Sequence, residues 1–459
     1  MTVQTKKTQR RDLLAADIPT TLRKMTIPMI YGMIMLMTFG LVDTFFVSLL
    51  GTQQLAAISF TFPVTFTLIS LNIGLGIGTS AIIGRYLGSG DETHAKETGT
   101  GALILSALLV GVLAIIGAIT IQPVFHWLGA SELLMPYIYD YMIVWYVAGV
   151  FLAIPMVGNS ILRASGDTKT PSLIMAAGGG INAALDPLLI FGWGPVPAMG
   201  IQGAAVATMV AWGISVVWIL YLLAVQRKLI EPRLLNWTEL KRSSAGVLKI
   251  GLPAAGANML TPIAGGIMTK LVAAYGAGAV AAWGVGNRLE SMASIVVLAL
   301  SMSLPPLVSQ NFGAGHIHRV REAYSLSIKF VMFWQLGVFF IMWLLSPFIA
   351  AAFTDDAQVA ALIQLFLMIV PLGYGLQGVV ILTNSSFNAM HKPMSGLVLS
   401  IIRLFIFFVP ISYVGSLLYN LEGMFWGGVL ANLLMASVSF VWFRRTILRD
   451  IQNATAIEQ

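Results

Sequence analysis

Long apolar runs alternate with short polar connections along almost the whole chain. The runs are long enough for helical crossings of a bilayer, each of which needs about 18 or more apolar residues. Because lipid offers the backbone no hydrogen-bond partner, such runs form helices. A transmembrane barrel would instead show alternating segments of roughly ten residues, and these runs are longer and apolar on all sides. The pattern predicts an all-α membrane protein with twelve transmembrane helices.

The twelve predicted helices, numbered 1 to 12 in chain order, cover residues 25–49, 55–84, 98–121, 135–162, 170–193, 199–224, 247–273, 279–310, 323–346, 358–388, 394–416 and 423–443.

The composition supports a membrane class and excludes several others. Apolar residues make up 57% of the chain and charged residues 10%. The net charge of +7 is spread along the chain, so it does not indicate nucleic-acid binding. The chain contains no cysteine, which excludes disulfides and thiol chemistry. No nucleophile and base motif or metal-ligand cluster is recognisable, so we expect neither an enzyme nor a metal site.

The basic residues predict the topology. Of the 26 Lys and Arg residues, 22 fall in or beside the termini and the loops that join even to odd helices, and the odd-to-even loops carry none. By the positive-inside rule, both termini are then cytoplasmic. The polar start of the chain precedes a long apolar run without a small-residue cleavage site, which indicates an uncleaved first helix. We expect a multi-pass protein of the bacterial inner membrane.

The second half of the sequence repeats the first at a fixed offset. Residues that match at this offset include Pro28 and Pro253, Gly51 and Gly276, Gly88 and Gly313, Glu97 and Glu322, and Asn159 and Asn384. We therefore predict an N-terminal lobe at 1–224, a charged cytoplasmic linker at 225–246, and a C-terminal lobe at 247–459 with a short cytoplasmic tail. Because each half has an even number of crossings, the halves are related as parallel repeats. Transporters of this plan bind between the lobes and alternate access by rocking.

Several motifs lie at characteristic places in the predicted helices: Pro28 early in helix 1, Val42-Asp43-Thr44 near its end, Gly88-x-Gly90 after helix 2, Asn182-x-x-x-Asp186-Pro187 in helix 5, and Gly200-x-x-Gly203-Ala204-Ala205-x-Ala207-Thr208 in helix 6. In order and spacing they resemble the multidrug and toxic compound extrusion (MATE) family over nearly the whole chain. This resemblance implies a cation-coupled exporter of amphipathic, often cationic compounds.

The resemblance also favours one branch of the family. Sodium-coupled, NorM-like members carry carboxylates in helices 7 and 10, and this sequence has none in either helix. The pattern is more similar to the DinF-like, proton-coupled branch, whose working carboxylates lie in the first lobe. Sodium coupling stays as an alternative.

Acidic residues inside membrane spans are costly and usually functional. Asp43 and Asp186 lie at one predicted depth, roughly 9 to 11 Å below the outer ends of helices 1 and 5 at about 1.5 Å per residue. Asn182 is one turn from Asp186 on the same helix face, and Thr208 can supply a hydroxyl nearby. Two carboxyls close together in low dielectric cannot both ionise cheaply, so the pair can carry a proton. The resemblance assigns ion-site roles to Asp43, Asn182 and Asp186, and less directly to Thr208.

Two other residues are secondary candidates for the site, and two more are predicted to have a structural role. Asp140 and Tyr139, near the outer end of helix 4, either extend a proton path or mark the membrane boundary. Glu290 in helix 8 and Arg403 in helix 11 lie at similar depth, which predicts a buried structural ion pair.

We therefore expect a proton-coupled antiporter that exports drug-like small molecules by alternating access. It would work as a monomer in the lipid bilayer, without a cofactor and without nucleic acid. Rival hypotheses are a sodium-coupled drug antiporter, a flippase for lipid-linked saccharides from the same superfamily, and a membrane receptor or scaffold. A flippase would favour a strongly cationic central cavity, and a receptor would show no ion-dependent flux.

Overall fold

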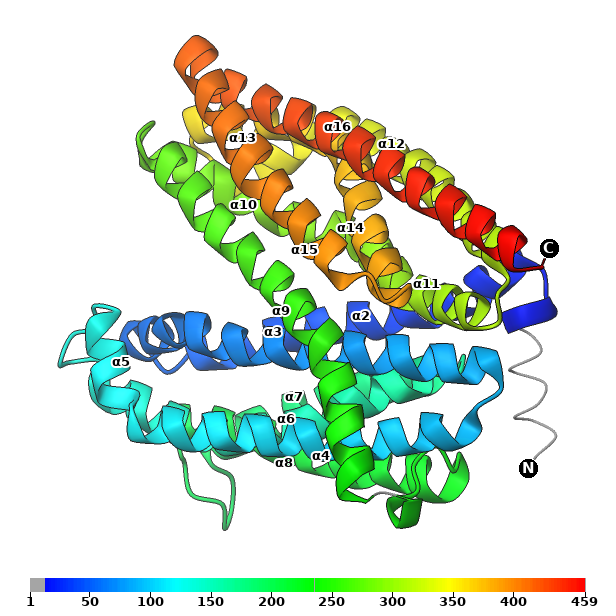
Figure 1. Ribbon diagram of the computed structural model, residues 1–459. Helices are drawn as coiled ribbons and strands as arrows, with labels where there is room; N and C mark the ends of the chain where they lie inside the picture. Colours follow the sequence, from blue (N-terminus) through cyan, green and yellow to red (C-terminus); the bar gives the residue numbers. More distant parts are fainter. Residues whose placement is uncertain (1–12, 235, 459) are drawn as a thin grey trace. The chain divides into compact units, whose positions relative to one another are not determined.

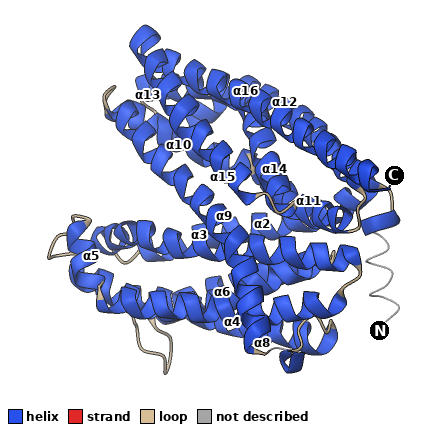
Figure 2. Ribbon diagram, in the orientation of Figure 1, coloured by secondary structure: helices blue, strands red, loops and turns tan. Residues whose placement is uncertain are grey.

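The computed structural model describes residues 13–234 and 236–458, and in these ranges the chain is almost entirely helical (Figure 2). The elements, many of them labelled in Figure 1, are α2 (Ile18–Ser48), α3 (Thr52–Ser89), α4 (Glu92–Ile119), α5 (Ile121–Trp127), α6 (Met135–Ala164), α7 (Lys169–Phe191), α8 (Ile201–Tyr221), η1 (Leu222–Gln226), η2 (Pro232–Leu234), α9 (Trp237–Ala273), α10 (Ala277–Ala293), α11 (Ile295–Gly313), α12 (Ile317–Phe353), α13 (Ala357–Ile369), η3 (Val370–Gly373), α14 (Tyr374–Ala389), α15 (Pro393–Ile401), η4 (Ile402–Phe408) and α16 (Val409–Glu458).

The described helices account for the twelve predicted crossings. Eleven helical segments are long and apolar enough to span a bilayer, and one of them, Pro393–Gln452, has 60 residues. This segment reverses direction inside α16, where Tyr419 and Asn420 leave the helical region of backbone angles. The segment therefore forms two crossings. The prediction of an all-α protein with twelve transmembrane helices is confirmed.

Glycines hold the two arms of this reversal together. A Cβ atom built on Gly415 would lie 2.1 Å from the carbonyl oxygen of Gly423, and one on Gly423 would lie 2.1 Å from that of Gly415. A Cβ on Gly427 would lie 2.6 Å from the carbonyl oxygen of Ile411. The pairs Gly415–Gly423 and Ile411–Gly427 are both centred on residue 419, so the helical arms before and after this residue run antiparallel. Only small residues allow helix backbones to approach this closely in a membrane.

Several helices differ from the predicted ranges. Predicted helix 8 is divided at Ser294 into α10 and α11, and predicted helix 10 is interrupted by the 3-10 turn η3. The first long helix begins at Ile18 instead of 25, and the last continues to Glu458 instead of ending at 443. In both end regions the helix continues into polar sequence, which a search for apolar runs cannot detect.

The described chain divides into two compact units. Unit 1 comprises 27–255, and unit 2 comprises 13–26 together with 256–458. Helices α2 and α9 therefore contribute residues to both units, with their boundaries close to Pro28 and Pro253. These prolines are partners in the internal repeat.

Unit 1 is held together by close contacts between α3 and the first part of α9. A Cβ on Gly74 would lie 2.3 Å from the carbonyl oxygen of Gly251, and one on Gly78 would lie 2.5 Å from that of Val247. Any larger side chain at these positions would push the helices apart. Apolar residues of α3, α6 and α8, among them Leu75 and Ile161, form the surrounding core.

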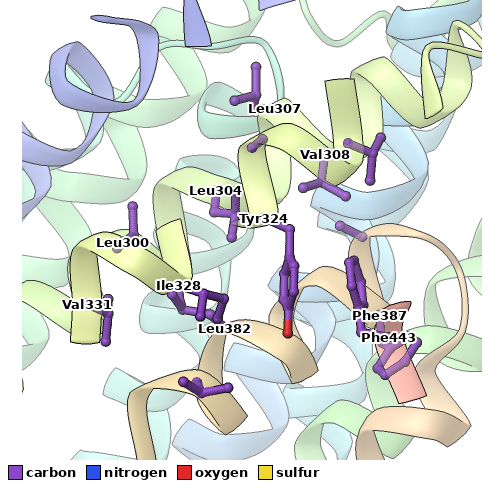
Figure 3. Close-up of a cluster of buried hydrophobic side chains, with 14 of the residues drawn as sticks. Leu300, Leu304, Leu307, Val308, Tyr324, Ile328, Val331, Leu382, Phe387 and Phe443 are labelled. Carbon is purple, nitrogen blue, oxygen red and sulfur yellow. The ribbon is translucent and has the colours of Figure 1, made fainter. Parts of the chain in front are cut away.

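Unit 2 has its own apolar core, part of which is drawn in Figure 3. Leucines and valines of α11 and α12 surround Tyr324, whose ring stacks on Phe443 of α16 with the centroids 3.8 Å apart. The Tyr324 hydroxyl lies 2.8 Å from the hydroxyl of Thr383, so the one polar group of this ring is hydrogen-bonded inside the core.

An ion pair occurs at corresponding places in the two units. In unit 1, Arg227 Nη2 lies 2.6 Å from Asp167 Oδ2. In unit 2, Lys392 Nζ lies 2.7 Å from Asp450 Oδ2. Asp167 and Lys392 are separated in sequence by the offset of the repeat, the same spacing as between Pro28 and Pro253. The two halves thus each have an ion pair at this point, with opposite charges at the matched positions Asp167 and Lys392.

Candidate functional site

Helices α2 and α7 lie in direct contact within unit 1. A Cβ on Gly32 would lie 3.0 Å from Ser172 Cα, and a Cβ on Gly179 would lie 2.2 Å from Phe39 Cδ2. The members of these two pairs are equally far apart in sequence, so the two helices run parallel and in register here. This register determines which residues meet one turn further along.

Asp43 and Asp186 meet next to this contact. Asp43 follows Phe39 by one helical turn and so lies on the same face of α2. The carboxyl groups of Asp43 and Asp186 lie within hydrogen-bonding reach of each other. The Asp186 side chain is completely buried, with 0% of its residue surface exposed, and Asp43 is half-buried.

The contact between these carboxyls has a chemical requirement. Among the described residues, no donor reaches Oδ2 of Asp186. An ionised carboxylate can only accept hydrogen bonds, so two ionised carboxylates repel each other at this distance. The arrangement is stable when one of them carries a proton, or when a cation lies between them.

Asn182 and Thr208 complete a short polar chain in unit 1. The Nδ2 atom of Asn182 lies 3.4 Å from Asp186 Oδ1 and 3.2 Å from Thr208 Oγ1. The Thr208 hydroxyl donates to the carbonyl oxygen of Ala204 at 3.0 Å, which leaves its lone pairs free to accept from Asn182. The structure thus brings all four leading candidates from the sequence together, from helices α2, α7 and α8.

Tyr141 of α6 belongs to the same cluster, although nothing in the sequence pattern distinguishes it. Its phenol is close enough to interact electrostatically with both Asp43 and Asp186. Tyr139 and Asp140, which were singled out instead, are exposed, and Tyr139 has 44% of its surface accessible. Successive helical residues point about 100° apart, so choosing among three neighbours requires knowing which face of α6 points inward.

Glu290 and Arg403 line one cavity in unit 2. The Glu290 carboxylate accepts a hydrogen bond from Gln377, and its charge interacts with that of Arg403. The direct ion pair that the sequence predicts is not among the ion pairs of the described residues, although both side chains line the same cavity. The same ranges contain no group of three or more His, Asp or Glu side chains placed to hold a metal ion.

Two six-helix repeats and a carboxyl pair within a membrane-spanning unit define a class of duplicated, multi-pass membrane proteins. Comparison with known families makes this assignment specific. The MatE family profile matches residues 28–188 and 253–414, once in each half of the sequence, and the chain belongs to this family. The two matches begin at Pro28 and Pro253, which are partners in the internal repeat.

Known proteins that are similar to this chain over most of its length include transporters. The chain is 39% identical over 447 residues to a protein of Shewanella oneidensis called an FAD transporter, covering 97% of this chain and 99% of the relative. It is 24% identical to the multidrug export protein MepA of Staphylococcus aureus, covering 90% of each chain. Among solved structures, the MATE transporter VcmN of Vibrio cholerae in its bent form is similar with a TM-score of 0.90 and 32% identity, covering 96% of this chain and 99% of VcmN.

Proposed function

We propose that the protein is a proton-coupled exporter of the DinF-like branch, in which Asp43 and Asp186 hold the coupling proton. The observation that carries this proposal is the contact between the two carboxyls inside unit 1. Asn182 and Thr208 support the pair as its hydrogen-bonding neighbours. We assign to all four residues a role in coupling.

The coupling follows from a difference in proton affinity between two conformations. A proton shared by Asp43 and Asp186 holds α2 against α7, and its loss leaves two repelling carboxylates at the same place. A conformation that separates them or supplies new donors is then favoured. A ligand shifts a conformational equilibrium only through such a difference in affinity, and here the proton is the ligand. Protonation from outside and deprotonation from inside would drive export by alternating access.

Sodium is the alternative coupling ion. Two carboxylates with the oxygens of Asn182 and Thr208 offer the oxygen ligands that hard cations prefer. The hydrogen bonds of Asn182 argue against this, because its Nδ2 atom, and not its oxygen, is directed at Asp186 and Thr208. A proton does not need a set of oxygen ligands, because the two carboxyl groups of Asp43 and Asp186 are enough to hold it.

For the substrate, we propose a flavin dinucleotide of the FAD type. The support is the similarity to the Shewanella FAD transporter, which extends over nearly the full length of both chains. Export of amphipathic or cationic drugs is the second candidate, and the lower similarity to MepA supports it.

The remaining features of the proposal concern location and assembly. We place the protein in the bacterial inner membrane with both termini cytoplasmic, as a monomer that needs no cofactor and does not bind nucleic acid. Residues 1–224 and 247–459 would act as the two lobes of the cycle, joined by the linker 225–246.

The test is transport by the purified full-length protein in liposomes, with each substrate measured against each ion gradient. FAD or ethidium would be supplied outside, with an imposed pH gradient, an imposed sodium gradient or neither. Because FAD is an anion, its exchange for a proton moves net charge; with the membrane potential clamped at zero, a one-unit pH gradient supports about tenfold accumulation per proton exchanged. We expect the pH gradient alone to drive FAD accumulation. Accumulation that follows only the sodium gradient would refute proton coupling, and ethidium transport without FAD transport would refute the substrate.

A further inference from the structure

Unit 2 contains a cavity of about 190 Å³. Its walls come from the second part of α9, from α10, from the start of α14, and from η4 and α16. The cavity is separate from the carboxyl cluster, all of whose members lie in unit 1. Its volume is slightly above the roughly 150 Å³ of an engineered cavity that admits benzene, so it has room for one or two fused rings.

Five buried polar atoms of the cavity lining lack a hydrogen-bond partner in the described chain. They are Trp283 Nε1, Tyr374 Oη, Arg403 Nε, Ser412 Oγ and Asn432 Oδ1. Buried polar atoms are normally paired, so each unpaired one calls for an explanation such as a bound molecule. All five atoms belong to side chains that line this one cavity, which makes the cavity the place where a molecule with complementary polar groups would complete them.

The chemistry of these atoms describes that molecule. Trp283 Nε1 and Arg403 Nε are N–H donors and Tyr374 Oη can donate, so a ligand that pairs with them must offer hydrogen-bond acceptors. Asn432 and Glu290 present acceptor oxygens, so the ligand must also carry a donor. Arg403 and Glu290 have opposite charges, which gives the cavity little net charge. An uncharged group fits this balance better than a phosphate or a cation.

The apolar walls favour a flat ring. Trp283 lies parallel to Phe425, with the ring centroids 6.1 Å apart and an angle of 13° between the planes. Met268, Met424 and Phe408 line the rest. Aromatic faces and polarizable thioethers suit stacking against a planar ligand.

Irregular helix geometry surrounds the cavity. Arg403 lies in the π-helical segment η4, and Tyr374 directly follows the 3-10 turn η3. Short π-helical segments inside α-helices are rare and often occur at functional sites. Arg403, from this wider turn, lines the cavity together with Glu290.

We propose that this cavity binds an uncharged, planar nitrogen heterocycle of one or two rings, with both acceptor and donor edges, as part of the transported molecule. The inference rests on the proposed function, because a flavin dinucleotide carries such rings. It adds a recognition site in unit 2, at a distance along the chain from the coupling residues of unit 1.

The experiment uses lumazine, a two-ring heterocycle with carbonyl acceptors and N–H donors, and isothermal titration of the purified full-length protein. Gly265 lines the cavity, and a Cβ built there meets no atom within 4 Å. Gly266 is equally unhindered but does not line the cavity, so it provides a matched control. We expect Gly265→Leu to abolish lumazine binding and Gly266→Leu to retain it.

A second variant tests the hydrogen bonds without filling the space. Trp283→Phe keeps a ring beside Phe425 and removes the N–H donor. The loss of one neutral hydrogen bond should weaken lumazine binding about tenfold or less. Naphthalene, which has the same ring size and no polar edge, should not distinguish wild type from Trp283→Phe.

The outcomes separate this inference from the proposed function. Equal lumazine affinity of wild type, Gly265→Leu and Gly266→Leu, or no binding to the wild type, overturns the cavity site even if FAD is transported. Lumazine binding that Gly265→Leu abolishes supports the site even if FAD transport fails, in which case only the proposed substrate falls.

Discussion

Gly179→Ala should uncouple transport from the proton by separating α2 from α7. A Cβ at position 179 would lie 2.2 Å from Phe39 Cδ2, 2.9 Å from its Cγ and 3.1 Å from its Cβ. Non-bonded carbon atoms prefer separations of about 3.5–4.0 Å. The Phe39 side chain cannot escape by moving its tip alone, because even its Cβ is closer than that. The helices must therefore move apart by roughly 1 Å to restore such a separation.

The expected size of the effect follows from this displacement. Overpacking of this kind costs about 1–3 kcal/mol of stability. The carboxyls of Asp43 and Asp186 lie one to two turns further along the same contact, and an O–H···O bond tolerates only about 2.5–3.0 Å between its oxygens. A shift of about 1 Å breaks the shared bond, so we expect proton-driven FAD uptake to fall about tenfold or more.

The assay is proton-driven FAD uptake into liposomes, together with the thermal unfolding midpoint of each variant. Gly180→Ala is the matched control, because its Cβ would make only an ordinary contact of 3.6 Å with Phe39 Cζ. The double variant Phe39→Ala/Gly179→Ala removes the clash and should recover much of the lost uptake. Gly179→Ala protein with wild-type uptake and stability would refute the reasoning, since the α2–α7 contact would then not set the geometry of the pair.

Three further predictions concern Asn182, Tyr141 and the two ion pairs related by the repeat. Asn182→Leu removes the hydrogen bond to Asp186 and should reduce proton-driven uptake about tenfold, whereas uptake equal to wild type would exclude Asn182 from coupling. Tyr141→Phe removes a hydroxyl beside the carboxyl pair and should shift the pH dependence of uptake at unchanged expression; an unchanged pH profile would make Tyr141 a packing residue. Arg227→Ala leaves Asp167 without its cation, and because the Asp167 side chain is only 5% exposed, the free energy of unfolding should fall by about 2 kcal/mol. Lys392→Ala should lower it less, because the Asp450 side chain is 21% exposed and water can replace the lost cation. Equal losses of stability in these two alanine variants would contradict this ranking.

The sequence contained enough information for the architecture because lipid imposes a simple rule on it. Every crossing must be a long apolar helix, so the spans and the repeat are visible as apolar runs and as a fixed offset. The interruptions at Ser294 and η3 were missed, although Ser294 is polar and η3 contains Pro371, because single polar residues and prolines also occur inside unbroken membrane helices. Hydrophobicity reports burial in lipid and does not report helix geometry.

The carboxyl cluster was partly predictable for a related reason. An acid within a membrane span is conspicuous, so Asp43 and Asp186 could be identified from position alone. Tyr141 could not, because tyrosines are common at membrane boundaries and its role depends on the rotation of α6. The five residues with unpaired atoms around the unit 2 cavity are likewise ordinary in sequence, and only their shared place in its lining distinguishes them.

The central claim is that one proton is held between Asp43 and Asp186 and exchanged for substrate. It is tested most directly by proton flux measured with a pH-sensitive dye trapped inside liposomes, after FAD is added. Asp43→Asn and Asp186→Asn keep the size of each side chain and remove its titration, while Asp140→Asn changes an exposed acid and serves as the control. The account predicts FAD-dependent proton movement in the wild type and in Asp140→Asn, and none in the other two variants. Proton movement at the wild-type rate in both Asp43→Asn and Asp186→Asn would contradict it.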